Sequence, residues 1–295
     1  MGLFGRNIMY WILLIFSIAL AVFKSSLYNT YAQKSELTIF KTFSFNILSY
    51  GTASCVALIG LLIKSQTISK ATVLCALLYA IIVVSLQTIS ISAMKVGAMS
   101  TTSICVMYGL IIPSVAGPIF WKEPIGFMQI IGILMMLASL WLIKGKVTDE
   151  KKISKNWVIL AAIAFLLSGM AGVMEKIHQS TDGKEERMSF VFVACASMFV
   201  FSLVAGIITR KDEKINSLAT TLPIAALTGL VIGLYSTVNL ILSGKLDSMI
   251  YYPVANGGAM ILTVFVSVIA FKERFDKARI VGTVMGLLGI LLLSI

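Results

Sequence analysis

Residues 95–143 read KVGAMSTTSICVMYGLIIPSVAGPIFWKEPIGFMQIIGILMMLASLWLI, and residues 245–293 read KLDSMIYYPVANGGAMILTVFVSVIAFKERFDKARIVGTVMGLLGILLL. The two stretches align without a gap when every position is shifted by 150 residues. The identities fall at Lys95/Lys245, Met99/Met249, Ile111/Ile261, Ile119/Ile269, Lys122/Lys272, Glu123/Glu273, Ile130/Ile280, Gly132/Gly282, Met135/Met285, Leu137/Leu287 and Leu142/Leu292. Chance matches of Ile and Leu are common in apolar chains, but a matched Lys-Glu turn between apolar runs is not. We interpret the pair as an internal duplication, which in a membrane chain is typical of transporters.

The composition places the chain in the membrane class. Of its 295 residues, 58% are hydrophobic and 13% are charged, and the mean hydropathy is +0.96. One soluble core cannot enclose so much apolar side chain, so lipid must cover part of it. Inside a bilayer, each segment satisfies its own backbone polar groups by forming a helix. We therefore expect an all-α integral membrane protein in the cell membrane.

Ten apolar runs are long enough to cross a bilayer, whose hydrocarbon core of about 30 Å needs roughly 17 to 25 helical residues. The runs are 7–28, 37–63, 71–93, 97–120 and 125–143, then 156–179, 188–209, 221–243, 248–271 and 277–295. We predict ten transmembrane helices in two five-helix repeats, at residues 1–146 and 156–295, joined by a linker at 147–155.

The odd number of spans in each repeat determines how the repeats are oriented. If one repeat enters the membrane from one side, the next enters from the other side. A pseudo-two-fold axis in the membrane plane then relates them, so the repeats are inverted. A substrate site is expected between them near the midplane, and rocking about it would open the site to each side in turn.

The order of these features resembles the drug/metabolite transporter superfamily, EamA type. In both halves the Lys-Glu turn is followed by a Gly-bearing helix, with Gly126 and Gly132 in the first and Gly282, Gly286 and Gly289 in the second. Phe23-Lys24 and Glu175-Lys176 lie near the ends of the first and sixth helices, where such proteins often carry a lysine. The resemblance covers nearly the whole chain and implies a secondary transporter of small metabolites, often amino acids. Other branches carry nucleotide sugars, sugar phosphates or drugs, so the resemblance transfers the fold and not the substrate.

Polar residues recur at helical spacing in several apolar runs, and such a stripe faces the protein interior rather than lipid. The candidate substrate-binding residues are Lys24, Asn46, Gln87, Tyr108, Tyr235, Asn239, Tyr251, Tyr252 and Asn256. Small polar residues also join helices, at about 0.6 kcal/mol each. The amides of Gln87, Asn239 and Asn256 are costly to bury without a partner, which makes them stronger candidates.

Prolines lie in the fourth run and in its duplicate, the ninth. Pro113 and Pro118 interrupt the fourth, and Pro253 lies early in the ninth. Each removes a backbone donor and frees a carbonyl. We predict either hinges that expose backbone acceptors to the site or kinks that serve packing.

No acidic residue falls in the middle of a predicted span. Those near the span ends are Glu36, Glu123, Glu175, Asp247 and Glu273. A proton-coupled exporter of organic cations would need a carboxylate inside the membrane, so that activity is disfavoured. Lys24, Lys41 and Lys176 lie just inside the apolar runs, where a lysine either binds an anionic group or extends to the interface.

The chain carries 24 basic and 13 acidic residues, and the basic ones are scattered over short loops rather than gathered for nucleic acid. More of them lie on the side opposite the termini, so the positive-inside rule favours both termini outside. The family resemblance implies both termini inside. The orientation therefore stays open.

Neither an enzyme nor a metal site is expected. The single histidine, His178, and the four cysteines, Cys55, Cys75, Cys105 and Cys195, show no metal-ligand spacing and no nucleophile–base pair. We expect no cofactor. Gly282 and Gly286 have the spacing of a small-residue helix contact, either within the chain or in a homodimer.

These patterns predict a secondary active transporter that moves a small neutral or zwitterionic, amino-acid-like metabolite outward by alternating access. Its partners would be this small molecule and the lipid bilayer. The alternative substrate is an anionic or phosphorylated metabolite, of the nucleotide-sugar or sugar-phosphate type. A membrane subunit without transport activity is a less favoured interpretation.

Overall fold

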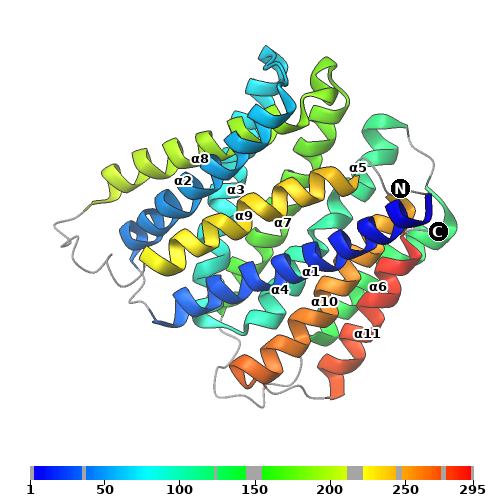
Figure 1. Ribbon diagram of the computed structural model, residues 1–295. Helices are drawn as coiled ribbons and strands as arrows, with labels where there is room; N and C mark the ends of the chain where they lie inside the picture. The colour runs from blue at the N-terminus through cyan, green and yellow to red at the C-terminus, as the bar shows by residue number, and fades with distance from the viewer. Residues whose placement is uncertain are drawn as a thin grey trace.

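A computed structural model shows the chain as a bundle of α-helices (Figure 1). It describes residues 3–34, 38–122, 125–143, 155–210, 222–243, 248–273 and 277–293. Every secondary-structure element in these ranges is helical. The elements are α1 (Leu3–Lys34), α2 (Ile39–Lys64), α3 (Lys70–Val96), α4 (Met99–Met107), η1 (Tyr108–Leu110), α5 (Ile111–Trp121), α6 (Phe127–Ile143), α7 (Lys155–Gln179), η2 (Asp182–Glu185), α8 (Arg187–Thr209), α9 (Leu222–Ser243), α10 (Ser248–Phe271) and α11 (Lys277–Leu292).

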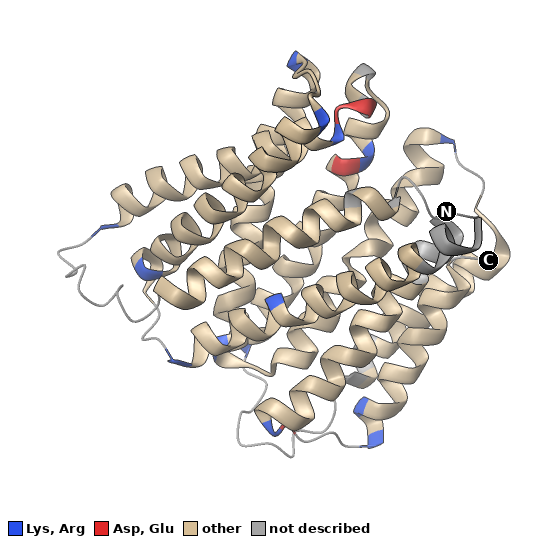
Figure 2. Ribbon diagram, viewed as in Figure 1, with Lys and Arg blue, Asp and Glu red and all other residues tan. Residues whose placement is uncertain are grey.

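The side chains are distributed as lipid requires. Eight helical segments in the described part are long and apolar enough to cross a membrane. Ile63 and Ile208 are 76% and 77% exposed, whereas Asn46 and Ser49 are fully buried at 0%. Charged residues lie mostly towards the ends of the helices (Figure 2). Apolar side chains outside and polar ones inside indicate a multi-pass helical membrane protein.

Helix α1 continues to Lys34, beyond the apolar run that the sequence predicts at 7–28. Its last turns carry tyrosines that pack inside the protein, which is why the helix does not end with the apolar run. Tyr31 is buried and stacks on Phe45 of α2, with ring centroids 4.1 Å apart. Lys24 therefore lies well inside α1 rather than near its end.

The two matched Lys-Glu turns begin with the same backbone conformation. Lys122 and Lys272 both have φ of 54°, the left-handed conformation that ends many helices. At the first turn, the Lys122 N–H donates to the carbonyl of Gly117. At the second, the Glu273 N–H donates to the carbonyl of Ser267 at 3.1 Å. Both bonds satisfy carbonyls that a helix end would otherwise leave unpaired.

The carboxylate of Glu273 caps a helix from the other half of the chain. It accepts hydrogen bonds from the Met99 N–H at 2.7 Å and from the Ser100 hydroxyl. These groups begin α4, where a negative charge is stabilised by the helix dipole. Glu123, the matched position in the first half, lies outside the described residues.

Helices α6 and α11 pack closely through glycines. Helices α2 and α8 also lie side by side (Figure 1). A Cβ at Gly132 would lie 2.7 Å from the carbonyl oxygen of Gly289, and a Cβ at Gly289 would lie 2.8 Å from that of Gly132. Gly286, one turn earlier in α11, faces Tyr108 of the same chain. Gly286 and Gly289 thus pack within the chain, and the homodimer alternative stays a prediction.

The fourth predicted span is a broken helix. The 3₁₀ turn η1 separates α4 from α5 just before Pro113, which has no N–H to donate to the carbonyl of Gly109. Pro118 lies inside α5. The matched helix α10 is helical from Ser248 to Phe271. Pro253 falls within it, but its side chain lies outside the described residues. The hinge role of the prolines stays a prediction.

Candidate functional site

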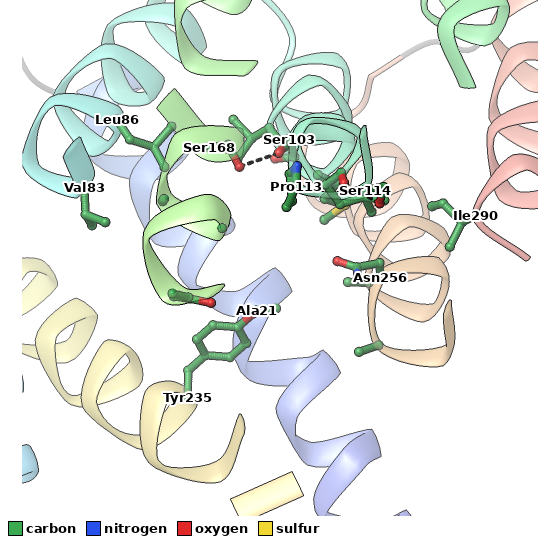
Figure 3. Close-up of a pocket in the computed structure, with 18 of the residues that line it drawn as sticks. Ala21, Val83, Leu86, Ser103, Pro113, Ser114, Ser168, Tyr235, Asn256 and Ile290 are labelled. Carbon is green, nitrogen blue, oxygen red and sulfur yellow. Dashed lines mark hydrogen bonds between the residues drawn. The ribbon is translucent and has the colours of Figure 1, made fainter. Parts of the chain in front are cut away.

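A cavity of about 820 Å³ lies between the two halves of the chain. The first half lines it with α1, α3, α4, α5 and α6, and the second half with α7, α9, α10 and α11. Figure 3 shows Tyr235 of α9 and Asn256 of α10 beside this space, with Ala21 of α1 nearby. The volume is that of a small-molecule site.

One wall of the cavity carries a lysine whose ammonium group lies over the ring of a tyrosine. Lys24 of α1 and Tyr235 of α9 both line the cavity. The Nζ atom of Lys24 lies 4.6 Å from the centre of the Tyr235 ring. Such a cation–π contact is worth about 0.5 to 2 kcal/mol, depending on how far water is excluded. It holds the lysine head group beside the cavity and away from the lipid.

A second wall of the cavity carries a carboxylate that accepts a hydrogen bond from a tyrosine hydroxyl. Glu175 of α7 and Tyr79 of α3 line the cavity, and the Tyr79 Oη donates to Glu175 Oε1 at 2.8 Å. The sequence places Glu175 near the end of a span, one turn before α7 ends at Gln179. The cavity extends to this level, so Glu175 faces it. The absence of a central carboxylate therefore does not exclude a cationic group as ligand.

A chain of hydrogen bonds fixes the polar floor of the cavity. Tyr28 Oη donates to Gln87 Oε1 at 2.9 Å, and Gln87 Nε2 donates to Asn46 Oδ1 at 2.8 Å. Asn46 Nδ2 in turn donates to Thr88 Oγ1 at 3.0 Å. Tyr28 and Gln87 line the cavity, whereas Asn46 is fully buried behind them. Asn46 therefore holds Gln87 in place and does not itself face the cavity.

The remaining amide candidates lie on α9 and α10. Asn256 lines the cavity together with Ser17 of α1. The Ser17 hydroxyl donates to the amide oxygen of Asn239, which places Asn239 directly behind the lining. The polar stripes predicted on these two helices thus supply one residue that faces the cavity and one that supports it.

Other predicted residues lie elsewhere or outside the described set. Tyr108 is fully buried, its hydroxyl is 2.7 Å from that of Ser139, and it packs between helices rather than lining the cavity. Pro113 and Pro118 do line the cavity. The side chains of Tyr251 and Tyr252 lie outside the described residues.

Tyr28, Ser103 and Ser168 are among the polar lining residues that the sequence does not single out. Tyr28 lies one turn after Lys24 and so shares its face of α1, a spacing that could have identified it. Ser168 of α7 donates to the carbonyl of Val106 at 2.7 Å. The Ser103 hydroxyl is buried and has no hydrogen-bond partner among the described residues. No sequence signal separates these serines from the many others in the apolar runs.

His178 belongs to a different cluster, at the end of α7. Its Nε2 lies 3.1 Å from Thr72 Oγ1, which donates to Glu186 Oε2 at 2.7 Å. Hydrogen bonds from Thr72 and from the Ser69 N–H lower the pKa of Glu186 to about 2. This cluster joins the start of α3 to the turn between α7 and α8. Among the described residues, no three His, Cys, Asp or Glu side chains gather as a metal site would require.

No protein-family model matches the chain, and no curated protein matches its sequence. Among solved structures, one described only as the crystal structure of a protein is similar, with a TM-score of 0.63 and 13% sequence identity. The match covers 94% of this chain and 95% of that one. At this identity the likeness concerns the fold alone.

Proposed function

We propose that the chain is a ten-helix secondary active transporter of the drug/metabolite transporter superfamily, EamA type. It moves a small neutral or zwitterionic, amino-acid-like metabolite across the cell membrane by alternating access. The direction proposed from the family resemblance is export. The observation that carries the proposal is one small-molecule cavity lined from both halves of a membrane protein.

The pattern of helix contacts supports inverted repeats. Counting α4, η1 and α5 as one span gives ten, in which α1 corresponds to α7, α2 to α8 and α3 to α9. Helix α1 packs on α9 and its counterpart α7 packs on α3. Likewise α2 packs on α9 and its counterpart α8 packs on α3. Helices α2 and α8 pack on each other, as α6 and α11 do. A two-fold axis between the halves generates this exchange of partners.

The matched backbone of the Lys-Glu turns supports the same arrangement. Lys122 and Lys272, 150 residues apart, share one unusual backbone conformation at equivalent helix ends. A non-glycine residue in the left-handed region is uncommon. Two of them at matched positions favour common descent of the two halves.

Flux into proteoliposomes tests the proposal. The purified chain is reconstituted and offered a broad panel of labelled amino acids, amines, organic acids and phosphorylated metabolites. We expect uptake or counterflow of at least one small zwitterion above that of empty vesicles. Asn256→Ala should lower this flux without lowering the amount of folded protein, whereas Asn156→Ala, at the exposed start of α7, should leave it unchanged. Absence of flux for every solute would contradict transport.

One observation favours an anionic substrate as the second candidate. Lys24 and Lys176 both line the cavity, and the Nζ of Lys176 lies 5.0 Å from the centre of the Trp121 ring. Two cations beside one carboxylate give the lining a net positive charge. Preferential flux of phosphorylated solutes in the same panel would establish this alternative.

A further inference from the structure

The two charged walls of the cavity join corresponding helices of the proposed repeats. Lys24 and Tyr235 join α1 to α9, whereas Glu175 and Tyr79 join α7 to α3. Under the proposed inversion α1 corresponds to α7 and α9 to α3, so the two pairs join the same two helices of the repeat. Each pair sets a charged side chain against a tyrosine, but one charge is positive and the other negative.

The two charges interact across the cavity without touching. Each is an electrostatic partner of the other. Lys24 and Glu175 both belong to the described part of the chain, and the lysine nitrogen and the carboxylate oxygens do not lie within 4.0 Å of each other. Each charge instead contacts a tyrosine, Lys24 through the ring of Tyr235 and Glu175 through the hydroxyl of Tyr79. Space thus remains between a fixed cation and a fixed anion.

We propose that these pairs are the two ends of a zwitterion site, with a ligand carboxylate at Lys24 and a ligand ammonium group at Glu175. The inference rests on the proposed function for the symmetry between the pairs, and it defines the substrate class. A ligand with both charges, as in an α-amino acid, satisfies both protein groups when it displaces water from the cavity.

A ligand with a single charge is disfavoured by the same geometry. A carboxylic acid without an amine would pair with Lys24 but bring a second negative charge towards Glu175. An amine without a carboxylate would face Lys24 in the same way. Each would also leave one of the two protein charges without a ligand partner. The site therefore selects by repulsion as well as by attraction.

Binding of matched ligand sets to the purified full-length protein tests the site. Each set shares one carbon skeleton: alanine, ethylamine and propanoate; leucine, 3-methylbutylamine and 4-methylpentanoate; phenylalanine, phenethylamine and 3-phenylpropanoate. In at least one set we expect the zwitterion to bind about tenfold more tightly than the other two, as one lost charged hydrogen bond implies. Equal binding of an amine or an acid, or no binding by any zwitterion, would overturn the inference.

Variants assign the two ends. Lys24→Gln should weaken zwitterion binding about tenfold and leave the affinity for the matched amine no lower. Glu175→Gln should weaken zwitterion binding similarly and leave the affinity for the matched acid no lower. Lys41→Gln and Glu185→Gln are controls, because neither residue lines the cavity. A general fold defect would weaken all three ligands together, and equal losses for all three would contradict the assignment.

The outcome also separates this inference from transport itself. Flux of amines or acids without any preference for zwitterions would leave a transporter whose paired charges have another role. Binding of zwitterions at these residues without flux would support the zwitterion site and contradict transport.

Discussion

Gly286→Ala tests the packing that holds Tyr108 against α11. A Cβ at this position would lie 1.5 Å from Tyr108 Oη and 2.7 Å from its Cζ. Ordinary contacts begin near 3.4 Å, so the phenol must move by roughly 2 Å. Tyr108 is fully buried and its hydroxyl bonds that of Ser139, so this movement also breaks a buried hydrogen bond.

The expected loss follows from these contacts. Overpacking costs about 1 to 3 kcal/mol and an unpaired buried hydroxyl about 1 to 3 kcal/mol. Alanine regains about 1 kcal/mol of helix propensity relative to glycine. We expect Gly286→Ala to lower the free energy of unfolding by about 1 to 5 kcal/mol. Gly257→Ala in α10 is the control, because its Cβ would meet only Leu287 at 3.6 Å and should cost almost nothing.

Equilibrium unfolding of detergent-solubilised protein, followed by circular dichroism, measures both variants. Tyr108→Phe is a second variant for this test, because it removes the oxygen that the new Cβ would meet first. Combined with Gly286→Ala, it should recover about 1 kcal/mol or more of the loss. The reasoning is refuted if Gly286→Ala is as mild as Gly257→Ala, or if the two losses at Gly286 and Tyr108 simply add.

Three further predictions concern the helix ends, each measured by unfolding in the same detergent. Glu273→Ala removes the cap of α4 and should cost about 2 kcal/mol, whereas Glu273→Gln, which keeps one acceptor, should cost less; equal costs would contradict a charge-assisted cap. Lys122→Gly and Lys272→Gly relieve a left-handed backbone and should each stabilise by up to about 1 kcal/mol, and a loss at either would contradict this. Because Glu186 has a folded pKa of about 2 against an ordinary 4.5, its stabilisation is complete above pH 4.5 and is lost as pH falls towards 2. The wild type should therefore exceed Glu186→Gln in melting temperature at pH 6, and this advantage should be smaller at pH 3. A difference independent of pH would exclude the carboxylate as its source.

The sequence predicts the helical class and most helix positions, because a membrane span must be both apolar and long. It also predicts that the Lys-Glu turns end helices. It does not predict the length of α1, because Tyr28 and Tyr31 extend the helix by packing on neighbours that are remote in sequence. Nor does it predict the 3₁₀ break at Tyr108, which lies several residues before the proline that favours it.

The candidate site shows a similar division. Helical spacing identifies which face of a helix is polar, and Lys24, Gln87, Tyr235 and Asn256 all line the cavity. Spacing does not say which neighbour a face meets, so it does not separate Asn46, which supports Gln87, from a residue that faces the cavity. The sequence locates Glu175 only by its distance from the end of a predicted span. Whether a residue at that depth faces a cavity depends on the angles between neighbouring helices, which the pattern of one helix does not determine.

The cavity extends towards one end of the helix bundle. Its lining runs to Gln179 and Ile125, both exposed, at the end of the bundle where α7 finishes. Hydrogen bonding between Thr72 and His178 places the start of α3 at that same end, so α4 begins at the opposite end. There the Glu273 carboxylate joins α10 to the first residues of α4, two helices that both line the cavity. The cavity thus reaches one end of the bundle, and hydrogen bonds join two of its lining helices at the other end. On the proposed mechanism, reaching the second state of an alternating-access cycle would require the Glu273 contact to release, which couples the matched Lys-Glu turn to access as well as to folding.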